Sequence, residues 1–126
     1  MEVAQTCRQT LLVLTSLPDE ASAHAMAAAL VDERLAACVN VLAPCRSVYR
    51  WQGAIESATE VPLLIKTTAA RYAALEAAIR ARHPYELPEI VAVPVAHGLP
   101  EYLDWLVIET RAEALAEHPD GNPLTC

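Results

Sequence analysis

The feature that most limits the fold of this chain is the order of its strand-like and helix-like segments. Short apolar runs rich in branched side chains, typical of buried strands, alternate with stretches whose apolar residues recur at helical spacing. The expected elements are a strand over 10–15, a helix over 19–35, a long hairpin with arms over 38–51 and 55–67, a helix over 69–82, a strand over 90–95 and a short C-terminal helix from 100. This β-α-β-β-α-β order predicts an α+β, ferredoxin-like sandwich with two helices on one face of the sheet.

Three prolines mark boundaries of these elements. Pro44 lies inside the first hairpin arm and demands a bulge or an edge position there, because proline cannot donate to a strand ladder. Pro84 ends the second long helix, and Pro100 occupies the first turn of the final helix, where its missing N–H costs nothing.

The chain of 126 residues is the size of one ordinary domain, which we place over 1–111. Residues 112–126 have nothing to bury and are predicted to be a frayed or disordered tail.

The predicted sheet has apolar side chains on both faces. Residues 61, 63 and 65 would share one face, whereas Pro62, Leu64 and Lys66 would share the other. The two long helices cover one face, and the short final helix could cover only part of the other. Because soluble monomers rarely expose a large contiguous apolar surface, we predict that the chain assembles with copies of itself.

Composition excludes several classes of function. The formal net charge is -7 and the basic residues are scattered, which argues against a nucleic-acid-binding protein. Polar residues in the first ten positions replace the apolar stretch of a secretory signal, and no apolar run reaches membrane-spanning length. We therefore expect a cytoplasmic protein with no membrane partner, whose four cysteines are free thiols.

The stretch from His83 to Glu89 holds the most suggestive chemistry. One imidazole, one phenol and the carboxylates of Glu86 and Glu89 lie close together on a segment that two prolines keep extended. Such groups can bind a divalent metal, but only one histidine is present and the prolines forbid a two-histidine helical motif. The alternative is that the prolines shape a connection and the carboxylates are solvated.

An enzymatic function has little support in the sequence. The three glycines stand apart, so no glycine-rich phosphate loop is present. Cys38 and His83 are the only pair that could act as nucleophile and base, and nothing in the sequence places them together. Cys38 belongs to a predicted strand, where a thiol more often packs as a small hydrophobe. We therefore expect a protein that is not an enzyme.

Six segments together resemble the CutA family of divalent-cation tolerance proteins. They are Leu17-Pro18-Asp19-Glu20, residues 35–40, Ser47-Val48-Tyr49-Arg50-Trp51-Gln52-Gly53, residues 64–67, residues 83–89 and Glu101-Tyr102-Leu103-Asp104-Trp105. The resemblance implies a ferredoxin-like subunit in a compact homotrimer like the PII signalling proteins, with the long hairpin reaching round a neighbour. It also implies a role in tolerance of copper and other divalent cations, with no settled reaction.

The resemblance also implies site residues. In some family members a metal site uses a Cys at the end of the first strand and two adjacent histidines after the second helix. Those positions hold Thr15, Arg82 and His83 here, so Cys38, Tyr85, Glu86 or Glu89 would have to supply the missing ligands. We name His83, Cys38 and Glu86 as metal candidates for Cu(II) or another divalent cation. The family cleft between subunits would be lined by Trp51, Lys66, His83, Tyr85 and Glu89.

The sequence therefore predicts a non-enzymatic homotrimer that binds divalent cations, copper among them, and that serves in metal tolerance or in signalling through its intersubunit clefts. One alternative is a scaffolding trimer that binds a partner protein or a small anionic ligand without metal. Another is an enzyme that depends on Cys38 or His83.

Overall fold

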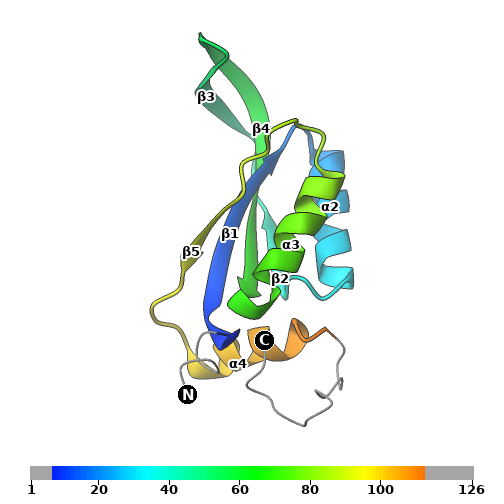
Figure 1. The fold of residues 1–126 in the computed structure, drawn as a ribbon, viewed down its shortest axis with the longest axis vertical. Helices are drawn as coiled ribbons and strands as arrows, with labels where there is room; N and C mark the ends of the chain where they lie inside the picture. Colours follow the sequence, from blue (N-terminus) through cyan, green and yellow to red (C-terminus); the bar gives the residue numbers. More distant parts are fainter. Residues whose placement is uncertain (1–6, 113–126) are drawn as a thin grey trace.

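The structure is a computed structural model that describes residues 7–112. Its elements in chain order are β1 (Thr10–Leu17), α2 (Glu20–Asp32), β2 (Cys38–Val41), β3 (Cys45–Trp51), β4 (Ala54–Thr68), α3 (Ala69–Arg82), β5 (Val91–Pro94) and α4 (Pro100–Glu109). Helices α2 and α3 lie on one side of the sheet, and α4 lies at its lower end (Figure 1). None of the described helices is long and apolar enough to cross a membrane.

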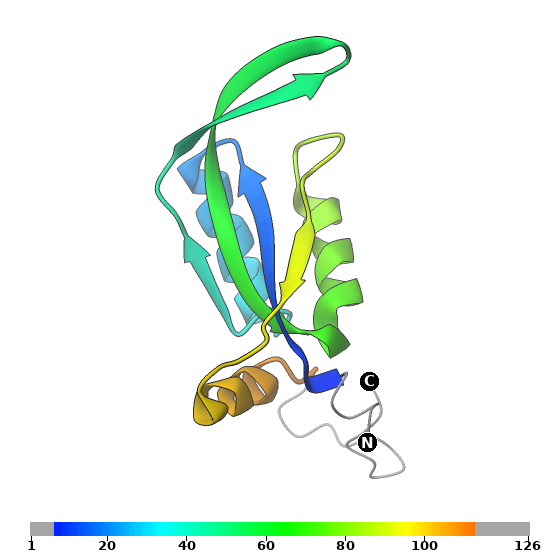
Figure 2. The same ribbon diagram turned by 90° about the vertical axis from the view of Figure 1, so that its left-hand side faces the viewer.

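The sheet is antiparallel, with the strand order β2-β4-β1-β5. The outer half of the long strand β4 leaves this sheet and pairs with β3, so that a two-stranded ribbon projects beyond the rest of the subunit (Figure 2). Among the described helices, only α4 lies against the sheet face turned toward the viewer in Figure 2, and it does so at the lower end. This is the predicted ferredoxin-like architecture, with the long hairpin and the short C-terminal helix in their expected places.

The core lies between the sheet and its two covering helices. Along β4 the side chains of Val61, Leu63 and Ile65 are buried, whereas the intervening residues are only half-buried. The buried set packs against an apolar stripe from the two helices, which consists of Ala23, Met26, Leu30, Leu75 and Ile79. The period of two predicted from the sequence is thus confirmed, because strand side chains alternate between the covered and the open face.

The first helix is shorter than predicted. Asp19 is its N-cap, and the Asp19 carboxylate accepts a hydrogen bond of 2.7 Å from the Ser22 N–H, which holds the pKa of that carboxyl below its usual value. The helix ends at Asp32, and Arg34 has a φ of 58°. A left-handed residue at this position turns the chain away from the helix axis, so the predicted extension to residue 35 is wrong.

The first arm of the predicted hairpin is divided into two strands. Residues 42–44, which include Pro44, interrupt the arm between β2 and β3, as the missing proline N–H requires. At the far end Gln52 and Gly53 both have positive φ, 48° and 83°, which fits a tight turn joining Trp51 to Ala54. The turn fixes the register of the whole ribbon.

The predicted C-terminal tail and the predicted free cysteines differ in how far the structure describes them. The predicted tail over 112–126 lies outside the described residues except for Ala112. Cys38 and Cys45 are free thiols, as expected. Cys7 is disulfide-bonded, so the expectation that all four cysteines are free is wrong.

Candidate functional site

His83 lies at the end of α3 and is only 8% exposed. Its Nε2 atom lies 2.7 Å from the carbonyl oxygen of Ser16 in β1, and its Nδ1 atom accepts a hydrogen bond of 3.1 Å from the Tyr85 N–H. The His83 and Tyr85 rings also pack together, with centroids 4.8 Å apart. The imidazole therefore joins the end of β1 to the segment that follows α3.

These two contacts define the tautomer of His83. A carbonyl oxygen can only accept a hydrogen bond, so Nε2 must carry the proton that is donated to Ser16. A backbone N–H can only donate, so Nδ1 must be unprotonated and its lone pair is used by Tyr85. In this arrangement neither ring nitrogen has a lone pair left for a metal ion.

Tyr85 faces Glu60 of β4. Burial raises the pKa of the Tyr85 phenol to about 12, with further contributions from its hydrogen bond to the Glu60 carboxylate and from the charge of that carboxylate. Tyr49 and Asp19 also lie near enough to raise this pKa. The segment after α3, the ribbon and the turn between β1 and α2 thus meet around one phenol.

The shift at Tyr85 predicts a loss of stability in alkali. The unfolded phenol loses its proton near pH 10 and the folded phenol near pH 12, so the unfolded state binds fewer protons between these values. Stability from this group is therefore complete below pH 10 and falls as the pH rises toward 12. Unfolding by urea measured at several pH values should show this decline, and a Tyr85→Phe variant should show less of it. An equal decline in both proteins would contradict the assignment.

The metal candidates from the sequence lie apart. Cys38 is in register with Lys66 and, through it, with Leu12, whereas His83 contacts Ser16, four residues farther along β1. Four residues of strand span about 13 Å. Glu86 is exposed on the segment after α3. Within residues 7–112 no three His, Cys, Asp or Glu side chains are grouped as a metal site would require.

The cleft candidates are also spread along one subunit. Trp51 is paired with Ala54 near the ribbon tip, Tyr85 faces Glu60, and Lys66 lies near the other end of β4. Each step of six residues along the strand covers about 20 Å. Glu89 is exposed on the segment before β5. One subunit alone therefore does not bring Trp51, Lys66, Tyr85 and Glu89 into a single site.

Lys66 has aromatic rather than acidic neighbours. Its Nζ atom lies 5.9 Å from the centroid of the Tyr102 ring, and that ring packs 5.5 Å from the Trp105 ring. The ion pairs among the described residues are made by Arg8, Arg34 and Arg82, and none of them involves Lys66. A half-buried cation on an apolar face is thus left available to an anion from outside the subunit.

Thr15 and Arg82, which occupy the other two positions of the family metal trio, are poor metal ligands. The Arg82 guanidinium forms an ion pair with the Glu33 carboxylate. Thr15 points into the covered core, is 1% exposed, and its Oγ1 finds no hydrogen-bond partner among the described residues. A neutral hydroxyl and a guanidinium supply no strong donor to a soft or borderline cation.

Two buried threonines should respond in opposite ways to the same substitution. Thr67 is also fully buried, but its hydroxyl donates a hydrogen bond of 2.7 Å to the Leu35 carbonyl. We expect Thr15→Val to raise the free energy of unfolding by about 1 kcal/mol, because it removes an unsatisfied buried hydroxyl. We expect Thr67→Val to lower it by about 1–2 kcal/mol, because it leaves a buried carbonyl unpaired. Urea unfolding of both variants would test this, and equal signs would contradict it.

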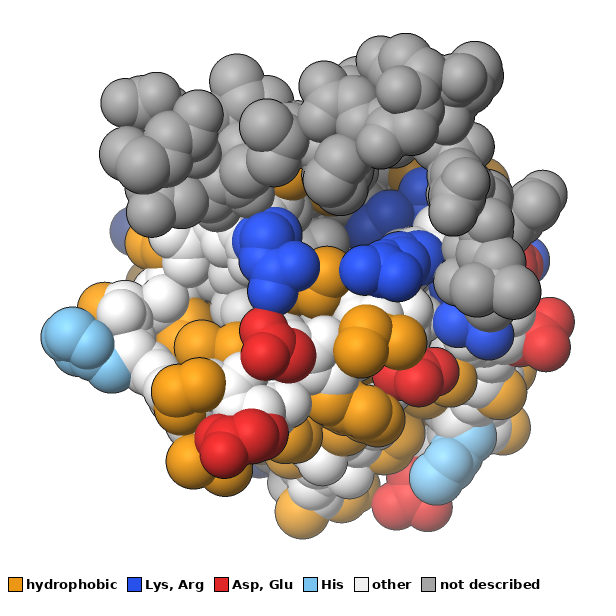
Figure 3. Space-filling view, turned by 90° about the horizontal axis from the view of Figure 1, so that it is seen from below, with side chains coloured by type: hydrophobic (Ala, Val, Ile, Leu, Met, Phe, Trp, Pro, Cys, Tyr) orange, Lys and Arg blue, Asp and Glu red, His pale blue; other side chains and the backbone are white. Residues whose placement is uncertain are grey.

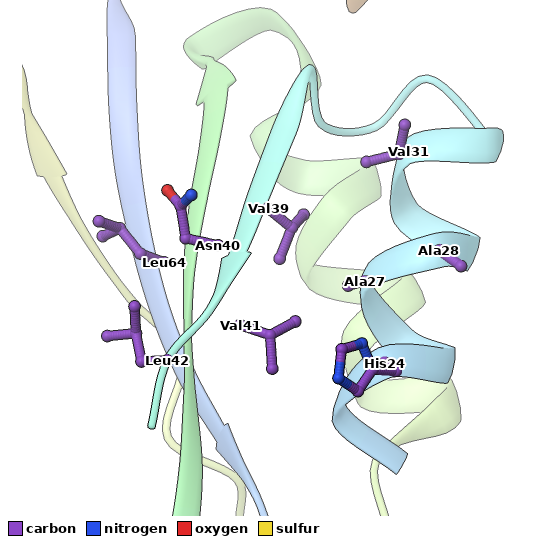
Figure 4. Close-up of a pocket in the computed structure, with 9 residues that line it drawn as sticks. All are labelled: His24, Ala27, Ala28, Val31, Val39, Asn40, Val41, Leu42 and Leu64. Carbon is purple, nitrogen blue, oxygen red and sulfur yellow. The ribbon is translucent and has the colours of Figure 1, made fainter. Parts of the chain in front are cut away.

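A shallow surface groove between α2 and β2 has little chemistry of its own. It has a volume of about 750 Å³ and lies between α2 and the edge strand β2. Figure 4 shows His24 of α2 pointing toward Val41 of β2, with the other lining side chains almost all apolar. A single exposed imidazole among alanine, valine and leucine side chains is not a catalytic arrangement.

The lower end of the molecule carries charges of both signs. Arg8 binds Asp104 at 2.8 Å and Arg34 lies 3.7 Å from Glu109, which ties neighbouring segments to α4. In Figure 3 the visible blue and red side chains lie close together beside an area of hydrophobic side chains. The described part of this end thus has no single-sign basic patch of the kind that binds nucleic acid.

Sequence reasoning missed two contributors to this site. The Ser16 carbonyl and the Glu60 carboxylate meet the segment after α3 only because β1 and β4 carry them there. The turn at Gln52-Gly53 sets Glu60 opposite Cys45. This pairing could have been worked out by counting residues from the turn along the two arms of the hairpin. No local signal connected either residue to His83 or Tyr85.

Comparison with known proteins finds relatives along most of the chain. Residues 11–109 match the family model described as CutA1 divalent ion tolerance protein. A divalent-cation tolerance protein CutA from Thermus thermophilus is 50% identical over 95 residues, which are 75% of this chain and 92% of that protein.

Solved structures agree with this match. CutA from Xylella fastidiosa has a TM-score of 0.80 and 48% identity, and the match covers 82% of this chain and 99% of that one. A protein from Archaeoglobus fulgidus described as a periplasmic divalent cation tolerance protein CutA has a TM-score of 0.78 and 34% identity, with 81% of this chain and 99% of that chain covered. Sequence and fold together place this chain in the CutA1 family of divalent ion tolerance proteins.

Proposed function

We propose that this protein acts in divalent-cation tolerance as a homotrimer whose functional sites are the clefts between its subunits. The observation that carries the proposal is the uncovered face of the sheet. That face presents half-buried Leu12, Leu14 and Leu64, and the exposed side chains of Val91 and Val93. An apolar surface of this kind calls for a partner, and closed rings of identical subunits are a common solution.

The projecting ribbon supports the same assembly. Val48 and Ile55, on its two arms, are 72% and 71% exposed, so the described part of their own subunit leaves them largely uncovered. A two-stranded ribbon is only marginally stable alone, so contact with a neighbour would secure it. The ribbon carries Trp51. If the ribbon packs on a neighbouring subunit, the Trp51 ring would approach Lys66 or Tyr85 of that neighbour.

The cation would then be bound by groups from more than one subunit. The described part of a single subunit has no cluster of three metal-binding side chains, so Glu86, Glu89, Glu60 or Cys38 would have to combine with residues of a neighbour. Carboxylates favour hard cations, whereas Cys38 would favour copper. The part of this protein in tolerance is proposed to be binding rather than catalysis, and the family description names tolerance and no reaction.

A second candidate function is favoured by Lys66. Its ammonium group has no acidic partner among the described residues and lies beside two aromatic rings. A trimer that binds a small anionic ligand there, or a carboxylate of a partner protein, would satisfy this charge without any metal. Cation and anion hypotheses predict different ligands for the same cleft.

Light scattering and isothermal titration test the proposal together. The proposed trimer should have three times the 13.6 kDa subunit mass. Saturable binding of Cu(II) or Zn(II) to that trimer would support the cation site, and binding would raise its melting temperature. A trimer that binds neither metal would favour the anionic ligand or scaffold, and a monomer would contradict the proposal.

The proposed location is the cytoplasm. Free thiols at Cys38 and Cys45 are compatible with a reducing compartment, whereas the disulfide at Cys7 is more typical of an oxidising one. The Archaeoglobus relative is described as periplasmic. Fractionation of cells that express the chain with a C-terminal tag would decide between the two compartments.

A further inference from the structure

His83 closes a gap at the end of the sheet. The pairing between β1 and β5 runs from Leu11 to Leu14 on the β1 side, so the Ser16 carbonyl lies beyond it. The His83 Nε2–H donates to this carbonyl and continues the hydrogen bonding where the strand ladder has stopped. Because His83 is buried, the loss of this bond would leave a backbone acceptor without a replacement from water.

The second ring nitrogen fixes the segment after the helix. Nδ1 accepts a hydrogen bond from the Tyr85 N–H, the two rings are in contact, and the Tyr85 phenol lies beside Glu60. A metal ion bound to either nitrogen would have to displace one of these hydrogen bonds. Metal coordination by His83 would therefore break a hydrogen bond that joins β1 to the segment 83–90 or one that orders this segment.

The residues at the other two positions of the trio supply no metal ligand that could compensate for these lost hydrogen bonds. The Arg82 side chain is engaged by Glu33, and the Thr15 hydroxyl is enclosed in the core on the covered face. Neither group is a good ligand for Cu(II) or Zn(II). The donor set at Thr15, Arg82 and His83 thus does not fit a divalent metal.

We infer that His83 is a positioning residue rather than a metal ligand, and that its neutral ring joins β1 to the segment 83–90 and holds Tyr85 against Glu60. The contacts that carry this inference lie within one subunit and do not depend on the proposed trimer. A cation bound by this protein is accordingly held by groups other than the His83 ring.

Nitrogen NMR of the full-length protein tests this directly. In uniformly labelled protein the His83 ring should show a protonated Nε2 and an unprotonated Nδ1, and both resonances should stay unchanged when Zn(II) is added in excess. The exposed His24 and His97 report adventitious binding in the same spectra. A His83 nitrogen that shifts at one Zn(II) per subunit would overturn the inference. If Zn(II) does not bind at all, the His83 assignment stands and the cation part of the proposed function fails.

Variants provide a second measurement. His83→Ala should lower the melting temperature by roughly 5–10 °C. His83→Gln should recover part of this loss, because its amide N–H can donate to the Ser16 carbonyl, and His97→Gln is the matched exposed control. Zn(II) affinity should stay within about twofold in the folded variants, whereas a tenfold loss in a folded, stable His83→Gln variant would sink the proposal.

Discussion

A Leu64→Glu variant is expected to have one third of the solution mass of the parent protein, which we propose to be three times 13.6 kDa. Leu64 lies on the open face of the central strand β4, in register with Leu14 of β1 and Asn40 of β2. A carboxylate at this position would be buried without a partner in an assembled trimer, at a cost of several kcal/mol per subunit. In a separate subunit the same carboxylate would face water.

Light scattering over a range of concentrations measures this change, and circular dichroism shows whether the subunit keeps its fold. Ala73→Glu is the matched control, because it adds the same charge to an exposed position of α3, on the covered side of the sheet. We expect the control to remain a trimer. If Leu64→Glu is also a trimer of unchanged stability, the open face is not the contact between subunits.

Leu63→Ala is expected to lower the free energy of unfolding by about 2–5 kcal/mol. Leu63 is the neighbour of Leu64 in β4 but points to the covered face, where it is 0% exposed and belongs to the core between the sheet and the two helices. Alanine leaves a cavity that this close-packed interior can only partly fill. The variant should keep its oligomeric state where it stays folded, in contrast to Leu64→Glu.

Urea unfolding at a fixed protein concentration measures this loss, since the stability of an oligomer depends on concentration. Leu87→Ala is the control, because Leu87 is 70% exposed in the described subunit and should change the free energy by no more than about 0.5 kcal/mol. Equal effects of the two substitutions would mean that the covered face is not the core of the subunit.

Much of the fold was predictable because its signals are local. The alternation along β4, the helical stripe over Ala69–Arg82 and the irregularity expected at Pro44 each follow from a few neighbouring side chains, although the structure has a break there and not a bulge within one strand. The overlong first helix shows the limit of such signals, because the left-handed turn at Arg34 is not marked by a glycine.

The candidate site was predictable only in part. Sequence proximity drew attention to His83 and Tyr85, and the two residues contact each other. It could not show that the His83 ring uses both nitrogens in hydrogen bonds, since one partner, Ser16, lies 67 residues away. Nor could it separate Cys38, which lies in β2, from His83, which follows α3 and contacts β1 near the other end of the sheet.

The sequence by itself determined the order of elements, the covered and open faces of the sheet and the membership of a family, because periodicity and motif depend on residues close together in the chain. Only the tertiary structure decided the state of the His83 ring, the pairing of Tyr85 with Glu60 and the position of the Lys66 ammonium beside the Tyr102 ring. Each of these depends on which strands and loops approach one another, and hydrogen bonds and charges act only over the few ångströms that folding sets.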